Sequence, residues 1–461
     1  MTRSTRLTLV LLFLTVAMAR FCHTRILWVE EAYPSAAAAQ ILDGKFLYRD
    51  IWFDKPPLYA LFYLLCGTGA SLRLLGTLFV ALCCALVYRF ARQLWGEPEA
   101  VLAACLLGFY LTFGIPSAVM ALAPDLLMIA PHIAAVYLAW RGKPFWSGLL
   151  AGVALLVNSK GVFVLAACAI WQYHALPALL FGFAVPNAVF AAVLLANGAM
   201  GAYFAQVWTW GFLYSRDGLV SAATGLARTA NWMGFHATIV IAGAWFLRRE
   251  KRWLAWLLLS LVAVAAGWRF FPRYYFQLLP VFTLAAARGL MLMHTRWRIA
   301  VLSLLLIPAL RFGPRYATLA GDLLHSRPHE WSDLAMNQDS QKAAGMVRAM
   351  ARPGDTLLVW GYRPDVFVYS GLPAATRFLD SQPLTGVLAD RHLTSTQLTA
   401  PEWAARNRQE IAAARPSFIV DGLGLLNPAL SVGHFQSLDD YDEVGRTPMS
   451  VVYRLRRTLE R

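Results

Sequence analysis

Long apolar stretches separated by short polar segments run through the first two thirds of this chain. The first covers residues 7–19, and others lie near residues 70–90, 99–114, 117–139, 145–158, 161–173, 175–197, 229–247, 253–268, 274–292 and 298–312. A helix of about 20 apolar residues crosses the hydrocarbon core of a bilayer. The pattern therefore predicts a polytopic all-α membrane domain over residues 1–320, with about eleven transmembrane helices.

The first apolar stretch follows Arg3 and Arg6 and ends at Ala17-Met18-Ala19, which resembles a signal-peptidase site. Cleavage is therefore one interpretation of this segment. Because many more spans follow, we expect the segment to remain as an uncleaved anchor.

After residue 320 the pattern changes to that of a small water-soluble α/β domain, residues 321–461. Residues 355–361 and 417–422 read as buried strands that end in turns, and residues 339–351 and 403–414 read as helices. No dinucleotide-binding loop, P-loop or nucleophile elbow occurs in it. The chemistry is therefore expected in the membrane domain.

The composition agrees with this division. Hydrophobic residues make up 58% of the chain and charged residues only 15%, whereas a soluble domain carries about 25% charge. Residues 1–320 hold 26 Lys and Arg against 10 Asp and Glu, and residues 321–461 hold 15 against 16. The basic excess therefore belongs to the membrane part, where it indicates positive-inside topology and not nucleic-acid binding.

The basic loops also set the orientation. With the N-terminus inside, the inner loops carry Arg89, Arg92, Arg141, Lys143, Arg248, Arg249, Lys251, Arg252, Arg288, Arg296 and Arg298. An odd number of spans then places the C-terminal domain on the other side. We therefore expect a multi-pass protein of the cell's inner (plasma) membrane, with its C-terminal domain and its active site on the extracytoplasmic side.

Most acids of the membrane domain fall on the outer side in this topology. They are Glu30, Glu31, Asp43, Asp50, Asp54, Asp125 and Asp217. Several lie in a long first outer loop, residues 21–57, which is too amphipathic to span and too aromatic to be a solvated linker. We therefore expect the chemistry on the outer face of the membrane.

Glu30 and Glu31 directly follow the first span, where a carboxylate costs free energy unless it is paired or functional. A solvated surface pair is the simpler interpretation. Asp125 lies deep in an apolar context, and its simpler interpretation is a helix N-cap after Pro124. All three carboxylates are candidates for the chemistry.

Outer cations form the second candidate group. Lys55 lies in Asp54-Lys-Pro-Pro-Leu58, and Lys160 interrupts an apolar region at a turn. Each could meet a lipid phosphate or only snorkel to headgroups. Arg269 and Arg273 open a later span from the outside, against the positive-inside trend, which favours a phosphate partner. A general base with cations that stabilise a phosphate leaving group is suited to sugar transfer from a lipid-phosphate donor.

Three blocks carry a resemblance to a known family: residues 30–50, beginning Glu-Glu-Ala-Tyr and ending Tyr-Arg-Asp; Lys55-Pro-Pro-Leu58; and residues 273–280, Arg-Tyr-Tyr-Phe-Gln-Leu-Leu-Pro. Together they resemble the GT-C superfamily of integral membrane glycosyltransferases. Within it, the chain is most similar to the bacterial branch of protein O-mannosyltransferase-like, aminoarabinose transferase-like and lipopolysaccharide-core galacturonic acid transferase-like enzymes.

The resemblance implies an inverting, single-displacement transfer from a polyprenyl-phosphate sugar. Glu30 matches the catalytic base and Glu31 its neighbour. The family's usual first acid is Asp, so the choice between the two glutamates stays open. Lys55, Lys160 and Arg273 match cations near the donor phosphate.

The remaining matches concern the sugar and a metal. Asp125, Tyr33 and Tyr274 match the sugar or acceptor side. Asp54 matches a place where some relatives have an acid near a divalent metal, so a metal is an option and no cofactor is certain.

We therefore expect a membrane glycosyltransferase that acts on a glycan, lipid or protein acceptor of the cell envelope. The alternative is a transporter or flippase of lipid-linked sugars, which should show an internal repeat, and the sequence shows none. A nonenzymatic envelope scaffold is a further alternative, although it needs no acid pair at the membrane edge. The identities of the sugar and the acceptor stay open.

Overall fold

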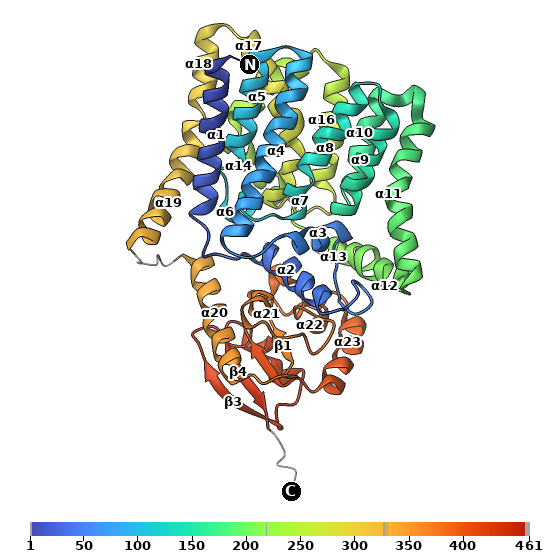
Figure 1. The fold of residues 1–461 in the computed structure, drawn as a ribbon, viewed down its shortest axis with the longest axis vertical. Helices are drawn as coiled ribbons and strands as arrows, with labels where there is room; N and C mark the ends of the chain where they lie inside the picture. Colours follow the sequence, from blue (N-terminus) through green and yellow to red (C-terminus); the bar gives the residue numbers. More distant parts are fainter. Residues whose placement is uncertain (1, 218, 326–328, 330, 457–461) are drawn as a thin grey trace.

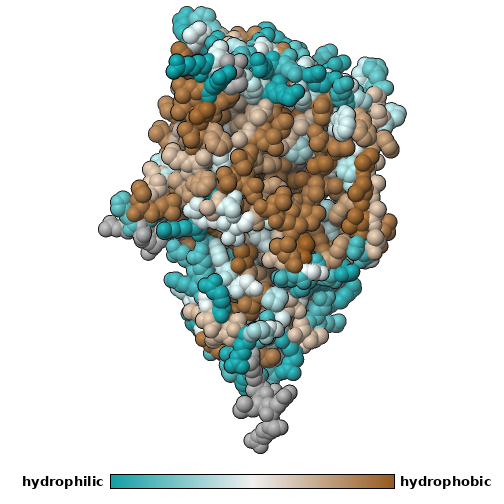
Figure 2. Space-filling model, in the orientation of Figure 1, coloured by the Kyte–Doolittle hydropathy of each residue, from teal (hydrophilic) through white to brown (hydrophobic). Residues whose placement is uncertain are grey.

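A helical bundle lies above a smaller α/β unit in the computed structural model, which describes residues 2–217, 219–325, 329 and 331–456. Figure 1 shows the two parts stacked along the long axis of the molecule. On the face shown in Figure 2, a broad hydrophobic belt covers the bundle between two hydrophilic ends. The apolar side chains of this belt are suited to contact with lipid.

Most of the bundle consists of medium-length helices. They are α1 (Arg3–Phe21), α4 (Ala70–Leu94), α5 (Glu97–Tyr110), α8 (Ile129–Trp140), α9 (Pro144–Val157), α10 (Gly161–Gln172), α11 (Leu176–Ala196), α14 (Ala222–Phe235), α15 (Ala237–Leu247), α16 (Lys251–Ala265), α17 (Leu279–Leu292), α18 (Thr295–Ser303) and α19 (Leu306–His325).

Fewer of these helices are long enough to cross a membrane than the sequence suggests. In the described part of the chain, five helical stretches qualify: Arg3–Phe21, Ala70–Leu94, Gly161–Ala196, Pro272–Leu292 and Thr295–His325. A sixth is added if α14 and α15, bent by 92°, form one span. The expected count of about eleven is therefore not confirmed. Helices such as α8, with 12 residues, and α9, with 14, are shorter than the bilayer core at 1.5 Å per residue.

A layer of short helices lies between the bundle and the α/β unit (Figure 1). It comprises α2 (Val29–Leu42), α3 (Pro57–Phe62), α6 (Pro116–Val119), α7 (Pro124–Leu127), α12 (Met200–Tyr203), η3 (Phe204–Thr209), α13 (Trp210–Asp217) and η4 (Pro272–Leu278). The aromatic residues Tyr48, Trp52 and Phe53 of the first long loop are buried here. Their burial explains why that loop is too aromatic to be a solvated linker.

The remaining residues, 332–456, form what we call the C-terminal unit. Its elements are α20 (Ser332–Met350), β1 (Leu357–Trp360), α21 (Asp365–Ser370), α22 (Gln382–Thr385), η5 (Ala389–Arg391), α23 (Pro401–Ala414), β2 (Phe418–Asp421), β3 (Tyr441–Arg446) and β4 (Val451–Leu455). The sheet order is β1-β2-β4-β3, with β1 and β2 parallel and β4 antiparallel to β2 and β3.

Both expected strands are present as β1 and β2, and every residue in them is buried. The expected helices lie within α20 and α23. The expected start of the domain at residue 321 falls inside α19, and its last residues, 457–461, lie outside the described part of the chain.

Polar contacts fix the C-terminal unit against the short-helix layer. The backbone N–H of Trp52 donates to the Arg377 carbonyl (2.8 Å), and the Lys45 ammonium donates to the Ala374 carbonyl (2.8 Å). Just before η4, Arg269 Nη2 donates to both carboxylate oxygens of Asp390 (2.9 Å each). The unit therefore covers the face of the bundle to which the sequence assigns its acids.

Candidate active site

A polar cavity of about 250 Å³ lies where the bundle, the short-helix layer and the C-terminal unit meet. Eight of the nine candidate residues named from the sequence line it: Glu30, Tyr33, Asp54, Lys55, Asp125, Lys160, Arg273 and Tyr274. They come from five separate segments of the chain. The fold therefore brings together the residues that the sequence analysis selected one by one.

The ninth candidate, Glu31, lies elsewhere although it follows Glu30 directly. Successive helix residues point about 100° apart, so in the first turn of α2 one glutamate faces the cavity and the other faces α4. Glu31 is fully buried, and its two oxygens accept from Arg73 Nη1 at 2.8 Å and Nη2 at 2.6 Å. This bidentate pair holds α2 to α4.

Glu30 and Asp125 share one cation. Arg273, at the start of η4, donates from Nη1 to the Glu30 carboxylate, and its Nε lies 3.8 Å from Asp125 Oδ2. Lys160 Nζ lies 3.4 Å from Asp125 Oδ1 and 3.2 Å from the centre of the Tyr274 ring. The result is an alternating row of two acids and two cations along the cavity wall.

Asp125 has the surroundings of a site residue and not those of a helix cap. It lies in the first turn of α7, whose N-cap is Ala123 with no side-chain capping bond. The buried Asp125 carboxylate instead accepts from Asn158 Nδ2 at 3.2 Å and pairs with Lys160. The apolar context of Asp125 in the sequence therefore reflects a paired carboxylate that faces a cavity.

Lys55 provides a third cation, just before Pro56, the N-cap of α3, and Pro57, its first residue. Its ammonium lies 2.8 Å from Asp54 Oδ2 and 5.7 Å from the centre of the Tyr214 ring. Its side chain is 37% exposed, against 30% for Arg273 and 11% for Lys160. Lys55 is therefore the most accessible of the three cations to a molecule that enters the cavity.

Aromatic side chains complete the wall. The Tyr33 hydroxyl donates to the Trp52 carbonyl at 3.1 Å, and its ring stacks on Phe53 with centres 4.9 Å apart. The Tyr59 hydroxyl donates to the backbone carbonyl of Glu30. These bonds fix the backbone around Glu30, so its side chain starts from a defined position.

Comparison with known proteins gives a match in fold and none in sequence. No protein-family model and no curated protein sequence matches the chain. Among solved structures, ArnT from Cupriavidus metallidurans bound to undecaprenyl phosphate matches with a TM-score of 0.61 and 15% identity, covering 96% of this chain and 97% of that one. The same protein in its apo state gives a TM-score of 0.55, 15% identity and the same coverage.

A second protein matches over a similar part of this chain. The Archaeoglobus fulgidus oligosaccharyltransferase in its apo form gives a TM-score of 0.51 and 13% identity, and covers 91% of this chain and 70% of that one. This chain therefore shares its overall fold with ArnT and with the oligosaccharyltransferase. The resemblance drawn from three short sequence blocks is therefore confirmed at the level of fold.

The structure adds cavity-lining residues that the sequence analysis did not select for the site. Tyr214 of α13, and Tyr362 just after β1, both line the cavity. Neither lies in a motif, and only the docking of distant segments reveals them. Arg73 did give a signal, because a cation inside an apolar stretch needs a partner. That signal could have identified the buried pair with Glu31.

Arg269 lies in the cavity wall on a strained backbone. Its neighbours Trp268 and Phe270 have φ angles of 50° and 49°, which cost bulky residues about 1–3 kcal/mol each. The bond to Asp390 and the Tyr214 ring, 4.0 Å from the guanidinium, hold Arg269 in place. The strain is therefore maintained where the bundle meets the C-terminal unit.

Asp380 lies behind the wall near Asp54. It is buried, and its Oδ1 accepts the Gln382 N–H at 2.7 Å. Burial, with a further contribution from the Asp54 carboxylate, raises the pKa of Asp380 to about 7. A titratable acid therefore lies next to the cavity, in a segment where the sequence gave no reason to look.

The donor set around Asp54 does not fit a divalent metal. Among the described residues, no group of three or more His, Cys, Asp or Glu side chains could hold a metal ion. The Asp54 carboxylate is paired with Lys55, and a cation at this position opposes a second one. No step of the chemistry below is assigned to a metal.

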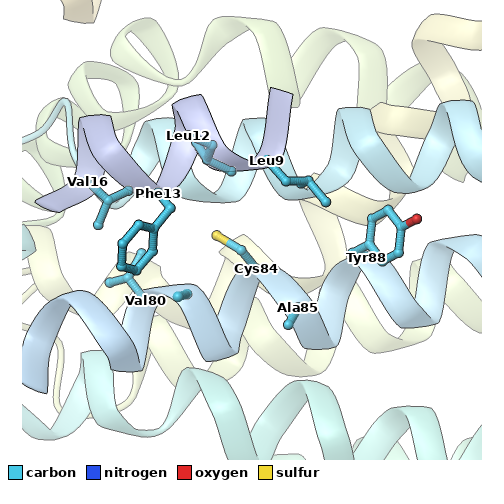
Figure 3. A pocket seen from close by; sticks show the side chains of 9 residues that line it. Leu9, Leu12, Phe13, Val16, Val80, Cys84, Ala85 and Tyr88 are labelled. Atoms are coloured by element: carbon cyan, nitrogen blue, oxygen red, sulfur yellow. The ribbon is translucent and has the colours of Figure 1, made fainter. Parts of the chain in front are cut away.

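Two further cavities lack such chemistry. One of about 300 Å³, between α1 and α4, is lined by residues such as Leu9, Leu12, Phe13 and Val16 (Figure 3). Another, of about 320 Å³, is aromatic and lies beside α14. Neither is lined by a carboxylate. The cavity around Glu30 is therefore the candidate active site.

Proposed function

We propose that this protein is an integral membrane glycosyltransferase that moves a sugar from a polyprenyl-phosphate donor to a glycan, lipid or protein acceptor of the cell envelope. The observation that carries the proposal is the cavity that places Glu30 beside Arg273, Asp125 and Lys160. A structure with the same fold, ArnT, was solved with undecaprenyl phosphate bound, which supports a lipid-phosphate donor.

In the proposed reaction, Glu30 accepts the proton of an acceptor hydroxyl. The resulting oxygen attacks the anomeric carbon of the sugar on the face opposite the lipid phosphate. The bond between that carbon and the phosphate oxygen breaks, and its electron pair leaves with the lipid monophosphate. One displacement inverts the anomeric configuration, and the proton remains on Glu30.

The leaving phosphate gains negative charge as the bond breaks. Lys55, Lys160 and Arg273 stabilise that charge in a partly buried site, where the interaction is stronger than in water. In the free site their charges are balanced by Asp54, Asp125 and Glu30. The donor phosphate therefore replaces acids as the partner of cations that are already in position.

Glu31 has an indirect role in this reaction, because it positions Glu30 and does not line the cavity. Its pair with Arg73 fixes the first turn of α2, which carries Glu30. Asp125 in turn orients Lys160 and Arg273. Tyr33 and Tyr274 line the space assigned to the sugar or acceptor.

The proposed orientation places the cavity and the C-terminal unit on the extracytoplasmic side of the inner membrane. The end of the bundle far from that unit is capped by hydrophilic residues (Figure 2). A pocket at that end is lined by Arg249, Arg288 and Trp95. Basic residues with interfacial tryptophan are typical of the cytoplasmic side.

The test of this function is transfer by the purified protein, supplied with polyprenyl-phosphate-linked sugars and envelope acceptors. Lys55→Ala should lower the transfer rate by 10-fold or more, about 1.4 kcal/mol of barrier, because the departing phosphate loses a cation. Lys143→Ala is the matched control, since Lys143 is exposed at the turn before α9.

Two outcomes would contradict the proposal. One is equal transfer by the Lys55→Ala variant and the wild type. The other is movement of the intact lipid-linked sugar across a vesicle membrane with no transfer to any acceptor, which would favour a transporter. Mass spectrometry of envelope glycans from a deletion strain would then identify the sugar and its acceptor.

A further inference from the structure

The carboxyl ends of the parallel strands in the C-terminal unit face the membrane site. β1 and β2 run in register from Leu357 opposite Phe418 to Trp360 opposite Asp421. Just after β1, Tyr362 lines the cavity, and among the described lining residues it is the one that the C-terminal unit supplies. In open α/β sheets, ligands bind at the carboxyl ends of the strands. Tyr362 therefore occupies the position where such a unit is expected to meet a ligand.

The backbone at this position is tightly held. Gly361 has a φ of 118°, and a Cβ there would lie 3.3 Å from the Gly422 carbonyl carbon, so the turn requires glycine. The Gly361 N–H donates to Ser381 Oγ at 2.8 Å, and the Ser381 N–H donates to the Gly361 carbonyl at 3.2 Å. The next residue, Tyr362, is therefore presented to the cavity in a defined direction.

The Tyr362 hydroxyl is available to a ligand. It has no hydrogen-bond partner among the described residues, while the nearby Tyr33 hydroxyl is used by Trp52. The two tyrosine rings lie with their centres 6.3 Å apart. Burial and the neighbouring acids raise the pKa of Tyr362, so the hydroxyl keeps its proton and can donate it to a hydrogen bond.

The surroundings of this hydroxyl suit a sugar better than a phosphate. Three acids act on Tyr362 through their charge: Asp380, Asp54 and Glu30. Glu30 is paired with Arg273 and Asp54 with Lys55, whereas Asp380 forms no ion pair among the described residues. A neutral O–H donor beside carboxylates and an aromatic face can bind sugar hydroxyls, which are both donors and acceptors.

We infer that Tyr362 binds the sugar of the lipid-linked donor through its hydroxyl, so that the C-terminal unit completes the sugar subsite of the membrane domain. The inference rests on the proposed function. It makes the identity of the transferred sugar depend in part on a residue outside the membrane domain.

The test compares Tyr362→Phe with Tyr453→Phe, a change of the same kind at a partly buried tyrosine of β4 that does not line the cavity. Tyr362→Phe should raise the KM for the lipid-linked sugar about three- to tenfold, the range expected for one hydrogen bond between neutral groups. Inhibition by the sugar-free polyprenyl phosphate should stay unchanged. Tyr453→Phe should match the wild type in both measurements.

Three results would overturn the inference. Wild-type KM and kcat in Tyr362→Phe would show that the hydroxyl makes no contact. Equal weakening of polyprenyl-phosphate inhibition would place Tyr362 at the phosphate and not at the sugar. A wild-type protein that transfers no sugar would remove the proposed function, and this inference with it. Transfer by the wild type together with an unaffected Tyr362→Phe overturns the inference alone.

A second measurement does not depend on the kinetics of a variant. Cysteine at this position, in Tyr362→Cys, should react with a water-soluble maleimide, and the wild type is the control for the six native cysteines. The lipid-linked sugar should slow this reaction more than polyprenyl phosphate does. Equal protection by the two lipids would contradict a sugar contact.

Discussion

Glu30 and Glu31 are consecutive in the first turn of α2, yet their carboxylates lie in different surroundings. Glu30 faces the cavity, and Glu31 is enclosed with Arg73. The sequence left the choice of base open, because the partner that occupies Glu31 lies 42 residues away in α4. The structure supplies the physical distinction, since a carboxylate held by two short bonds is poorly placed to accept a proton from a substrate.

Glu31→Gln should destabilise the protein by about 3–5 kcal/mol, because it leaves the charge of Arg73 buried without its counter-charge. The free energy of unfolding in detergent would measure the loss. The double variant Glu31→Leu with Arg73→Met should recover much of it, because it removes both charges together. Equal stability of Glu31→Gln and the wild type would contradict a structural role for this pair.

Asp380 gives a pH dependence with a definite sign. Its pKa is about 7 in the folded protein and near 3.8 in the unfolded chain. Between these values the folded state holds a proton that the unfolded state has released, so stability falls as the pH rises from about 4 to about 7. At pH 8 the loss is on the order of a few kcal/mol.

Asp380→Asn should remove this part of the pH dependence, because asparagine keeps the shape of the side chain and cannot ionise. Unfolding midpoints of the wild type and of the variant between pH 5 and pH 8 would measure it. The variant should lose less stability over this range. Parallel curves for the two proteins would contradict a raised pKa at Asp380.

At the scale of elements, both predicted strands are present, and the predicted count of about eleven spans is not confirmed. β1 and β2 are runs of buried, mainly apolar residues that end at glycine turns. This pattern is local, so the sequence alone is enough to recognise it. The count of spans depends on how apolar stretches pack. Stretches such as α8 and α9 read as membrane crossings, although they are short helices packed against each other. Hydropathy records burial, and it cannot tell burial in lipid from burial in protein.

The contact between the segment before η4 and η5 is an element-level feature that no local pattern predicts. Arg269 precedes η4 and is nearly buried, while Asp390 lies in η5 of the C-terminal unit. Next to it, Arg391 donates to the Asp217 carbonyl of α13 at 2.7 Å. These bonds attach the C-terminal unit to the strained segment beside the cavity.

Asp390→Asn should loosen this attachment, because Arg269 loses the charge of its carboxylate partner in a nearly buried position. Amide hydrogen exchange in residues 386–400 should become faster, and sugar transfer should fall. Asp442→Asn is the matched control, since Asp442 pairs with Arg456 on the surface, where such pairs contribute little. Unchanged exchange in Asp390→Asn would show that the pair does not hold the unit in place.

At the scale of the whole molecule, the candidate site exists only where three layers meet. The resemblance identifies eight residues that line the cavity, because it ties them to one chemistry. It does not identify Tyr362, because the place of that residue depends on how the C-terminal unit docks. The same docking places the C-terminal unit next to the short-helix layer, whose α2, α7 and α13 carry Glu30, Asp125 and Asp217 (Figure 1).

The proposed transfer reaction depends on Glu30 as the group that removes a proton from the acceptor. The most direct measurement is the transfer rate of the wild type, Glu30→Asp and Glu30→Gln on one polyprenyl-phosphate-linked sugar, with Glu97→Gln at the far end of the bundle as control. If Glu30 is the base, the transfer rate should fall by about 100-fold or more in Glu30→Gln, stay partial in Glu30→Asp, and equal the wild-type rate in the control. A Glu30→Gln variant that transfers sugar at the wild-type rate would contradict this role of Glu30.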